Sequence, residues 1–585
     1  MTNILKHRIF TLICLVALIP LSCNQVSVNP TNGGYIHASG KKIVDGNENP
    51  LILKGIGLGG WMVQEGYMLG THGPQHEIRE YLESMAGKAA TDDFYESWLS
   101  NFVNQNDIYQ IAKWGYNSVR LPLHYDLFFS ERGQWMDHSK GLELTDKLLS
   151  WCEAAEIYLI LDLHAAPGGQ GNNQDISDRR NGESLWEDTR FVEMTKTMWF
   201  ELADHYKNES WIGGYDLLNE PNYDFENTGN TKGCTCRQNI PLRELYEELI
   251  DGIRAIDKNH LLIIEGNCYG SNYQGLESLA NYDTEKNLAY SFHNYWGSNT
   301  PAAMQSLITL RNELNIPLWR GEIGENSNTW FTEMVELMEV YQIGYANWPW
   351  KKIHSIDGPA IVPSHADWDK LMAYKTNNSR PRPTTSEAQN ALKVIAENIK
   401  LENVKLMEDV AYAYLKSPYG EGTTAYADHK MPGILYATDY DLGKREESWF
   451  DTDYQNTSGS SSNTAWNRGE SYRNDGVDIW PSSDAKSNGF YVGHIKSGEF
   501  LVFSMSSISA GTYNITVRAR ANQNREGKLN LMLDGSSLTN SPITISRSST
   551  WQDVVVTDVN VPDGEVLRLR FDQGDFDLAS IEFQK

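Results

Sequence analysis

The chain has 585 residues, of which 40% are hydrophobic and 11% aromatic, and a chain of this length is expected to fold as two domains rather than around one core. Its formal net charge of −27, with no basic run to offset it, would repel nucleic-acid phosphates and anionic lipid surfaces. This composition excludes a disordered chain, argues against a nucleic-acid partner and favours a neutral ligand.

The first residues, 1–23, have the pattern of an export signal. A basic start precedes an uncharged stretch from Ile9 to Leu21, which is too short to cross a bilayer comfortably. Cys23, in "LSCN", stands where bacterial lipoproteins carry their acylated cysteine, and the segment resembles a lipobox with Pro20 in the place usually held by leucine. We therefore expect an exported lipoprotein in the periplasm or on the surface of a Gram-negative bacterium, with a linker over residues 24–34. The alternative is cleavage by the ordinary signal peptidase, secretion, and no role for Cys23.

Four cysteines follow the signal: Cys152, Cys234, Cys236 and Cys268. Four cysteines in a large exported domain do not form a disulfide framework. The "GCTCR" pair lacks a neighbouring histidine and a second pair at ligand spacing, so we expect no metal there. A single bridge and free loop thiols both remain open.

Between residues 51 and 350, short apolar runs alternate with stretches of helical periodicity such as 144–155 and 242–256. The runs occupy residues 51–58, 116–122, 157–164, 213–220, 260–267, 288–295, 316–322 and 343–348. Runs that are apolar on both faces, alternating with amphipathic helices, are typical of a parallel sheet with crossover helices. Eight such units over about 300 residues predict a closed (β/α)8 TIM barrel, whose active groups lie at the carboxyl ends of the strands.

The barrel domain is expected to span residues 35–416. Near its end the sequence predicts a helix capped at Thr385 or Ser386. One face of that helix would carry Ala388, Ala391, Leu392 and Ile395. A Gly-rich segment then indicates a linker over residues 417–430.

Residues 431–585 have a different sequence pattern, in which short runs of alternating apolar and polar residues are separated by Gly, Ser and Asn-Asp turns. The clearest runs are 498–505, 511–521, 528–535, 551–561 and 565–571. No helical period is evident in them, so we expect an antiparallel β-sandwich of the jelly-roll kind.

The predicted barrel strands end in residues that carry chemistry. These are Arg120, Asp162 and His164, Asn219 and Glu220, His293 and Tyr295, Glu322, and Trp348 with Trp350. A single glutamate at such a place is more often a solvated loop acid or a helix cap. Two glutamates, Glu220 and Glu322, facing each other across a neutral, aromatic-lined cleft are what glycosidic bond cleavage needs, because one acid protonates the leaving oxygen while the other attacks or activates water.

The neighbouring residues can support this pair. Arg120 could hold Glu322 ionised, and Asn219 could bond the sugar 2-hydroxyl. His293 and Tyr295 could orient the two acids, whereas His164 is as readily a core histidine as a site residue. The loop tryptophans that could stack on sugar faces are Trp61, Trp186, Trp296, Trp348 and Trp350.

Two motifs carry a family likeness. "YDLLNEPN" resembles the acid/base motif of glycoside hydrolase family 5, and "WRGEIG" resembles its nucleophile strand. The resemblance implies Glu220 as acid/base and Glu322 as nucleophile. It also places functional residues at Arg120, His164, Asn219, His293, Tyr295 and Trp348, with Trp350 competing for the last place.

The substrate class is indicated by two further stretches. The segments of the exo-1,3-β-glucanase-like branch of the family resemble "LKGIGLGGWMVQEGY" and "DLHAAPGGQGNN" of this chain. This resemblance favours a β-glucan as the substrate. "HNYWG" departs from that branch, so its subsites cannot be transferred.

The C-terminal domain resembles a family 6 carbohydrate-binding module in segments such as "ESYRNDGVDIW" and "FDLASIEF". The resemblance implies sugar contact by an aromatic pair, Tyr472 and Trp551, with Asp577 in the usual asparagine place. The two glutamates that hold a structural calcium in that family correspond to Tyr436 and Thr438, which argues against calcium here. The alternative is a sandwich that merely packs against the barrel.

The sequence therefore predicts a monomeric retaining glycoside hydrolase acting on a β-glucan, with β-1,3 linkages favoured and no cofactor. Its two carboxyl groups would lie roughly 5 to 5.5 Å apart. One alternative is the same chemistry on β-1,4-glucan, mannan or xylan. Another is a surface glycan-binding protein without catalysis.

Overall fold

This computed structural model describes residues 34–415, 422–459, 466–521 and 525–585. The predicted export signal and Cys23 lie outside the described residues. In the part of the chain that the structure describes, no helix combines the length and apolar character that crossing a membrane requires.

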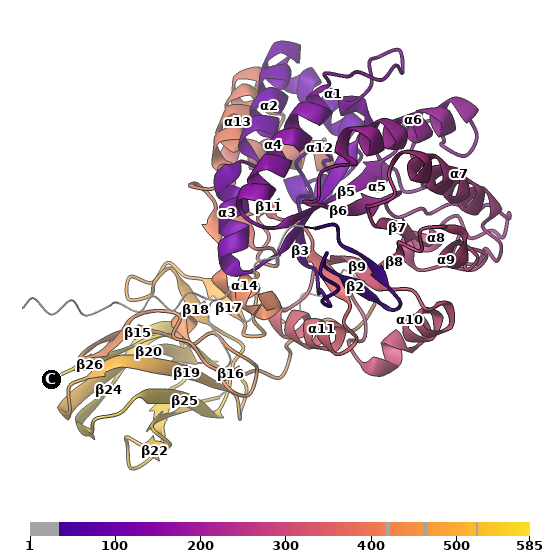
Figure 1. Cartoon of the computed structure of the whole chain (residues 1–585). Coiled ribbons are helices and arrows are strands. Elements are labelled where there is room, and N and C mark those ends of the chain that lie inside the picture. The colour runs from indigo at the N-terminus through magenta and orange to yellow at the C-terminus, as the bar shows by residue number, and fades with distance from the viewer. Residues whose placement is uncertain (1–33, 416–421, 460–465, 522–524) are drawn as a thin grey trace, which may run out of the picture. The chain divides into compact units, whose positions relative to one another are not determined.

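Eight parallel strands close into a ring in the order β10-β3-β4-β5-β6-β7-β8-β9 (Figure 1). They are β3 (Lys54–Gly57), β4 (Ser118–His124), β5 (Tyr158–Ala165), β6 (Ile212–Asp216), β7 (Leu262–Glu265), β8 (Leu288–His293), β9 (Leu318–Ile323) and β10 (Gly344–Asn347). Every one falls within or directly beside a predicted apolar run, so the TIM-barrel prediction is confirmed. The strands are buried on both faces, which explains why their sequences do not alternate.

Helices follow the strands, and the longer ones cover the outside of the ring (Figure 1). They are α1 (Gln75–Ala86), α2 (Lys88–Asn101), α3 (Gln105–Trp114), α4 (Lys140–Ala154), α5 (Gln174–Ser177), α6 (Thr189–Tyr206), α7 (Ile240–Ile256), α8 (Asn267–Gly270), α9 (Leu279–Tyr282), α10 (Pro301–Leu314), α11 (Asn328–Val340), α12 (Ala366–Thr376), α13 (Thr385–Asn398) and α14 (Glu408–Leu415), with 3₁₀ turns η1 (Gly66–Leu69) and η2 (Tyr125–Leu127). The predicted last helix is α13. Its N-cap is Thr384 rather than Thr385 or Ser386, because Thr384 and Glu387 form a reciprocal capping box.

The amino end of the barrel is closed by apolar packing. The hairpin of β1 (His37–Ser39) and β2 (Lys42–Val44) places Ile43 in the same buried cluster as Ile160 and Trp319 from the barrel strands. A small sheet of β11 (Lys351–Ile353), β12 (Ala360–Val362) and β13 (Lys405–Leu406) completes the domain. The carboxyl ends of the strands are left for polar residues.

The C-terminal domain consists of two mostly antiparallel sheets around their own core, as predicted. One sheet contains β14 (His429–Met431), β16 (Trp449–Phe450), β19 (Phe500–Ile508), β21 (Gly527–Leu533), β22 (Ser536–Ser537), β23 (Ile543–Ile545) and β25 (Val566–Gln573). The other contains β15 (Gly433–Tyr436), β17 (Ile479–Pro481), β18 (Phe490–Val492), β20 (Gly511–Ala521), β24 (Ser548–Val561) and β26 (Phe576–Gln584), with the 3₁₀ turn η3 (Ala437–Asp439) after β15. The change of architecture falls between α14 and β14.

Candidate active site

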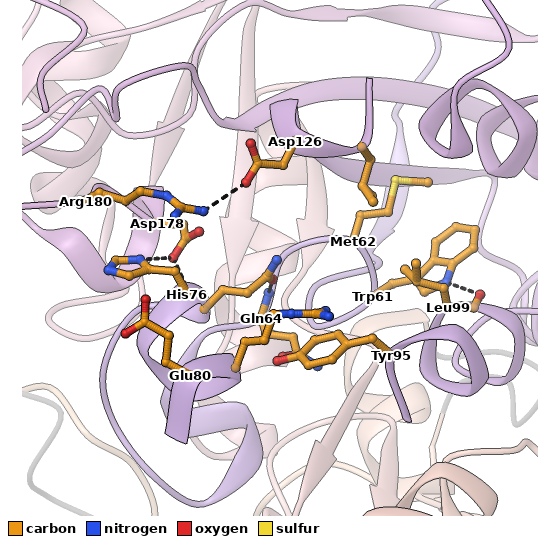
Figure 2. Close-up of a pocket in the computed structure, with 13 residues that line it drawn as sticks. Trp61, Met62, Gln64, His76, Glu80, Tyr95, Leu99, Asp126, Asp178 and Arg180 are labelled. Carbon is orange, nitrogen blue, oxygen red and sulfur yellow. Dashed lines mark hydrogen bonds and ion pairs between the residues drawn. The ribbon is translucent and has the colours of Figure 1, made fainter. Parts of the chain in front are cut away.

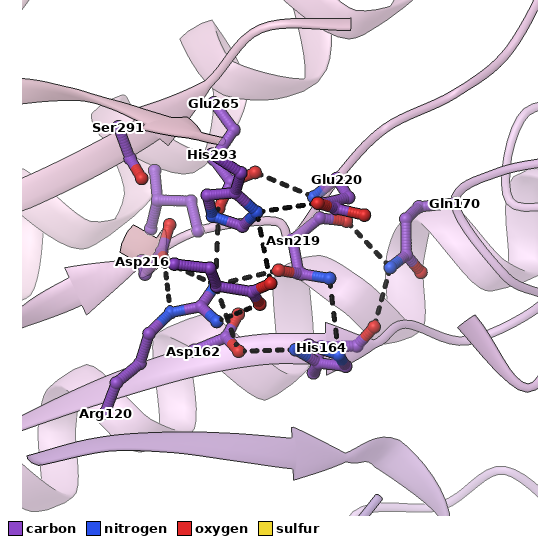
Figure 3. A network of polar contacts seen from close by, with 12 residues as sticks. Arg120, Asp162, His164, Gln170, Asp216, Asn219, Glu220, Glu265, Ser291 and His293 are labelled. Atoms are coloured by element: carbon purple, nitrogen blue, oxygen red, sulfur yellow. Dashed lines mark hydrogen bonds and ion pairs between the residues drawn. The ribbon is translucent and has the colours of Figure 1, made fainter. Parts of the chain in front are cut away.

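Arg120 is the centre of a buried polar network at the carboxyl ends of the strands (Figure 3). Its Nη1 donates to Oε1 of Glu322 at 2.7 Å, and its Nη2 donates to Oδ1 of Asn219 at 2.8 Å. Its Nε and Nη2 both donate to Oδ2 of Asp216, at 3.0 and 2.9 Å. Asp162 and Glu265 also lie within ion-pair distance. Burial alone would lower the pKa of this guanidinium, but the surrounding carboxylates raise it well above its ordinary value, so Arg120 is a permanent cation.

Glu322, near the end of β9, is held from both sides. Arg120 binds one carboxyl oxygen, and the Tyr295 hydroxyl donates to the other. Burial by itself raises the pKa of this acid, but the charges of His293, Arg120 and His164 outweigh burial and hold the pKa below its ordinary value. Glu322 is therefore an ionised carboxylate at neutral pH.

Glu220 follows β6 and is in the opposite electrostatic state. Its backbone has a φ of 43°, a left-handed conformation, and its N–H donates to Oε2 of Glu265 at 2.8 Å. Burial raises the pKa of its carboxyl group, the charges of Glu322 and Glu265 add to the rise, and a 2.7 Å hydrogen bond with Nδ1 of His293 opposes it. The net direction is upward, so Glu220 keeps a proton to higher pH than Glu322 does.

The two acids face each other closely. One carboxyl oxygen of Glu220, one of Glu322 and a ring nitrogen of His293 all lie within 4.8 Å of one another. These atoms are already engaged, because His293 bonds Glu220 while Arg120 and Tyr295 bond Glu322. The arrangement is that of an acid and a base around a reacting group rather than of an open set of metal ligands.

A second group with ligand-like spacing is His124, Asp126 and Asp178. Nε2 of His124 lies 3.0 Å from Oδ2 of Asp178, and Nδ1 of His124 accepts the backbone N–H of Asp126. Both ring nitrogens therefore have protein partners, and we interpret these three residues as a structural ion-pair cluster.

His164 lies in the site and is not merely a core residue. Its Nδ1 is 2.8 Å from Oδ2 of Asp162, and its ring stacks on Trp348 with 5.1 Å between centroids. Burial lowers the pKa of His164, but Asp162 and Glu65 outweigh burial and raise it to about 10. His164 is thus a second cation near Glu322.

Trp348 lines the catalytic cleft, and the glycines of the "GIGLGG" stretch make room for it. A Cβ atom would lie 2.4 Å from the indole of Trp348 if added at Gly57, and 2.6 Å if added at Gly59. The small residues of β3 and its loop therefore allow the tryptophan to lie flat beside His164.

The cleft around the two acids has a volume of about 810 Å³, which is enough for a ligand of more than one ring. The predicted residues that line it are His164, Asn219, Glu220, His293, Tyr295, Trp296, Glu322 and Trp348. Arg120 lies beneath them, wholly buried.

Three of the predicted sugar-stacking tryptophans are not among the residues that line the cleft. Trp186 donates its N–H to the Gln170 carbonyl at 2.8 Å and packs against Phe225. The predictions for Trp350 and Trp61 are wrong, because both side chains are buried elsewhere. Trp350 is fully buried, with its N–H bonded to Asp107 at 3.0 Å, because the chain turns its side chain into the helix layer beside Trp114. Trp61 is 1% exposed, donates to the Leu99 carbonyl, and lines a separate hollow of about 390 Å³ (Figure 2).

Comparison with known proteins agrees with this geometry. Residues 82–353 match the family model described as "Cellulase (glycosyl hydrolase family 5)". The matched segment includes both facing glutamates and the arginine beneath them.

This barrel is similar to the glycoside hydrolases of family 5 over residues 82–353. Residues 473–582 match the model described as "Carbohydrate binding module (family 35)". The expected family 6 module is therefore corrected to family 35. The segments that suggested family 6 are short strands and turns, which β-sandwiches of several families share.

Relatives of the barrel domain carry several activities in their names. A "Beta-xylosidase" of Phanerodontia chrysosporium is 31% identical over 278 residues, covering 47% of this chain and 55% of that protein. A "Probable glucan 1,3-beta-glucosidase A" of Aspergillus clavatus is 28% identical over 42% of this chain and 55% of its own length. An "Endoglucanase C" of Acetivibrio thermocellus is 26% identical over 44% of this chain and 87% of its own length. The chain thus spans about half the length of the first two relatives.

Among solved structures, a rutinosidase from Aspergillus niger aligns with a TM-score of 0.42 and 14% identity, over 52% of this chain and 90% of that chain. This similarity is too low to indicate a substrate.

The site contains acidic residues that the analysis of strand ends overlooked, two buried beneath the cleft and two lining it. Glu265 ends β7 and Asp216 ends β6, and both contact Arg120, so the acids inside "LIIEGN" and "GGYDL" were a usable signal. Glu65 and Glu325 also line the cleft; burial is the main cause that raises each pKa to about 7. Their loops have no periodic pattern that would have indicated inward-facing acids.

One wall of the cleft is fastened by a disulfide. Cys234 and Cys268 are bonded, while Cys152 and Cys236 are free and buried. Cys268 lines the cleft together with Tyr269 and Lys232, and Lys232 lies over the Tyr269 ring. The bridge joins the loops that follow β6 and β7, next to Glu220.

Each of the two aromatic residues predicted to bind sugar in the carbohydrate-binding module packs against another ring of the same domain. Tyr472 packs against Phe490, and its hydroxyl donates to Asp439 at 2.6 Å. Trp551 packs instead against Tyr491. Tyr472 is half-buried, and sugar contact by Tyr472 and Trp551 stays a prediction.

Trp551 and Asp577 are connected through Arg520. The guanidinium lies 4.7 Å from the Trp551 ring and donates to Oδ2 of Asp577 at 2.7 Å. Arg520 and Asp577 line a hollow of about 460 Å³ on the module. At the positions compared with calcium ligands, Tyr436 lies in β15 and Thr438 is fully buried, with its hydroxyl accepting from Asn488.

Proposed function

We propose that this chain hydrolyses β-glycosidic bonds with retention of anomeric configuration, and that its substrate is a β-glucan. The observation that carries the proposal is the pair of facing acids, whose oxygens lie within 4.8 Å and whose pKa values are displaced in opposite directions. In retaining enzymes the two carboxyl groups are about 5 to 5.5 Å apart, whereas inverting enzymes leave about 6.5 to 9.5 Å for a water.

In the first step, a carboxylate oxygen of Glu322 forms a bond to the anomeric carbon while the glycosidic C–O bond breaks. Glu220 gives its proton to the departing oxygen, so the leaving sugar is released as an alcohol. Arg120 and Tyr295 keep the Glu322 carboxylate ionised and hold its orientation through their hydrogen bonds. The product of this step is a glycosyl ester on Glu322, with Glu220 now ionised.

In the second step, Glu220 removes a proton from water, and the water oxygen attacks the anomeric carbon. The ester bond to Glu322 breaks, and both acids return to their starting states. Oδ1 of Asn219 is occupied by Arg120, so its Nδ2 is the atom available to donate to the sugar 2-hydroxyl. Every proton in this cycle is carried by a side chain of the cleft, so the proposal requires no metal or cofactor.

The β-glucan assignment, with β-1,3 linkages favoured, is supported by the "LGGWMVQEGY" and "DLHAAPGGQGNN" segments and by a relative named as a glucan 1,3-β-glucosidase. A second candidate substrate is a β-xyloside, because the relative named as a β-xylosidase is 31% identical. β-1,4-Glucan and mannan are the remaining candidates of the same chemistry.

A non-catalytic glycan-binding role is a different class of function. It is disfavoured because both acids and the residues that hold them, Arg120, His293 and Tyr295, are all present and mutually bonded. A decayed site would not need to keep opposite protonation states in two adjacent carboxyl groups.

For the module, we propose glycan binding at the hollow beside Arg520 and Asp577, with Trp551 as its aromatic edge. For the chain as a whole, we propose export, lipid anchoring at Cys23 and a monomeric state. A Cys23→Ala variant should move from the membrane fraction to the soluble fraction, and an unchanged membrane fraction would contradict the anchor.

The test of the function is product analysis on laminarin, lichenan, carboxymethylcellulose, glucomannan and xylan. We expect hydrolysis of at least one β-glucan, and loss of that hydrolysis in Glu220→Ala and Glu322→Ala. Activity on xylo-oligosaccharides alone would replace the glucan by the xyloside assignment. Binding without turnover on every member of the panel would favour the non-catalytic protein.

A further inference from the structure

The catalytic cleft includes two residues that do not come from the barrel. Gly459 and Trp466 belong to the C-terminal domain, in the connection between β16 and β17, yet they line the same cleft as Glu220 and Glu322. Barrel and C-terminal domain belong to one compact unit, residues 31–585. The module therefore contributes to the shape of the cleft.

Trp466 is fixed in place by buried hydrogen bonds. Its indole N–H donates to Oδ1 of Asn474 at 3.0 Å. Nδ2 of Asn474 donates to the backbone carbonyl of Asn326 at 2.7 Å and to Oδ1 of Asn328 at 3.0 Å. The backbone N–H of Asn474 donates to Oδ2 of Asp409 at 2.7 Å. Asn326 and Asn328 lie a few residues after β9, the strand that carries Glu322, and Asn328 is the first residue of α11.

A second connection uses the side chain of Asn326 as a substitute for backbone. Its Oδ1 accepts the N–H of Asn456, and its Nδ2 donates to the carbonyl of Asn456, both at 2.9 Å. Asn328 adds a bond to Asp475 at 3.1 Å. Asn326, Asn328, Asn456 and Asp475 are all buried, so each lost bond would leave a polar group without water. Buried hydrogen bonds of this kind fix the module against the barrel. A module that hung on a flexible linker would not need them.

Trp466 is 5% exposed, so it presents a narrow strip of indole to the cleft rather than a whole face. A strip of this kind acts as a wall: it limits where a sugar ring can lie and gives that ring an apolar contact. The cleft volume of about 810 Å³ leaves room for sugars beyond the one that reacts.

We propose that Trp466 is a substrate-contacting residue, which supplies the wall of a sugar subsite away from the bond that is cleaved. This inference rests on the proposed function, since it assumes that the cleft binds a β-glycan chain. It makes the module a part of the active site of its own chain, in addition to any glycan that the module binds at its own hollow.

The test compares Trp466→Ala, Trp466→Phe and Trp480→Ala in the full chain. Trp480 is the matched control, because it is a half-buried tryptophan of the same domain that stacks on His494 and does not line the cleft. Kinetics are measured on a soluble oligosaccharide series of two to six sugars and on an aryl monoglycoside, together with thermal unfolding of each variant.

We expect Trp466→Ala to raise KM for the longer oligosaccharides about tenfold, a size typical of losing one apolar contact, while kcat on the aryl monoglycoside changes less than about twofold. Trp466→Phe, which keeps a ring but loses the bond to Asn474, should lie between this variant and the wild type. Trp480→Ala should leave the kinetics on all soluble substrates unchanged.

Equal loss on short and long substrates, or no loss on either, would overturn the proposal and leave the hydrolase assignment intact. If Trp466→Ala does not fold, a wild-type length dependence in Trp466→Phe overturns the proposal, and a reduced one supports it. If the wild type cleaves no member of the series, the proposed function fails. The role of Trp466 is then decided by calorimetric affinity for the same oligosaccharides: a lower affinity in Trp466→Ala supports the proposal, and an unchanged affinity overturns it.

Discussion

Nδ1 of His293 lies 2.7 Å from Oε1 of Glu220. The same ring also lies near Glu265 and Glu322, and these acids outweigh burial and raise the pKa of His293 well above its ordinary value. His293 is therefore a cation between the two catalytic candidates. It lowers the pKa of both, and burial is what keeps Glu220 above its ordinary value despite it.

Replacement of His293 by asparagine should move both limbs of the pH profile. The active form needs Glu322 ionised and Glu220 protonated, so kcat/KM is bell-shaped, with Glu322 on the acid limb and Glu220 on the alkaline limb. Loss of a nearby cation raises a carboxyl pKa, so both limbs should shift to higher pH by roughly one unit or more. His260→Asn is the control, because His260 is a buried histidine paired with Asp257 at the amino end of β7. A shift of the alkaline limb to lower pH would contradict the assignment.

Replacement of Arg120 by methionine should destabilise the barrel and impair catalysis. The guanidinium faces Asp162, Asp216, Glu265 and Glu322, and removing one partner of a buried ion pair costs about 3 to 5 kcal/mol of unfolding free energy. The pKa of Glu322 is depressed in the folded protein, so its contribution to stability is present above the ordinary glutamate pKa of about 4.3 and is lost as pH falls through the folded value.

The stability difference between wild type and Arg120→Met should therefore be larger at pH 7 than at pH 3.5 in urea unfolding. Arg120→Lys keeps the charge without the two-pronged geometry and should lose less. An Arg120→Met variant as stable as the wild type at pH 7 would show that the network does not hold the acids.

Tyr295→Phe removes one donor from Glu322. A hydrogen bond to a charged group is worth about 1.5 to 3 kcal/mol, so kcat should fall roughly 10- to 100-fold while the fold is kept. Tyr345→Phe is a matched control, because the Tyr345 hydroxyl donates to the Tyr414 carbonyl in the core. Similar kcat losses in both variants would indicate a general effect of burying phenylalanine.

Reduction of the Cys234–Cys268 bridge should destabilise the wall beside Glu220. The two cysteines are 34 residues apart, and the loop-entropy model gives about 3 to 4 kcal/mol for a loop of that size. Cys234→Ser should lower the melting temperature and make it insensitive to dithiothreitol, whereas Cys236→Ser should behave as the wild type does. A melting temperature that is equal in both variants would contradict a structural role for the bridge.

The barrel could be predicted because buried parallel strands have a recognisable sequence pattern. Each run, such as 157–164, is apolar on both faces and ends in polar residues, and that pattern survives without any knowledge of contacts. The facing of Glu220 and Glu322 followed from the same rule, since strands of one barrel direct their carboxyl ends to one rim.

Side-chain direction beyond the strand ends could not be predicted. Trp348 and Trp350 are two residues apart, yet one lines the cleft and the other is bonded to Asp107 in the helix layer. Trp466 is more than 100 residues from the barrel strands in sequence and reaches the cleft only through packing of the two domains. Residue type gives no signal for either outcome, because it depends on loop conformation.

The central claim is that Glu322 is the nucleophile and Glu220 its acid/base partner. The most direct measurement is mass spectrometry of peptides after incubation with a 2-deoxy-2-fluoro-β-glycosyl fluoride, which forms the glycosyl ester but hydrolyses it slowly. We predict one added sugar on the peptide that contains Glu322, and no label in Glu322→Ala. A label on Glu220, or an α-configured first product with no labelled peptide, would contradict the mechanism.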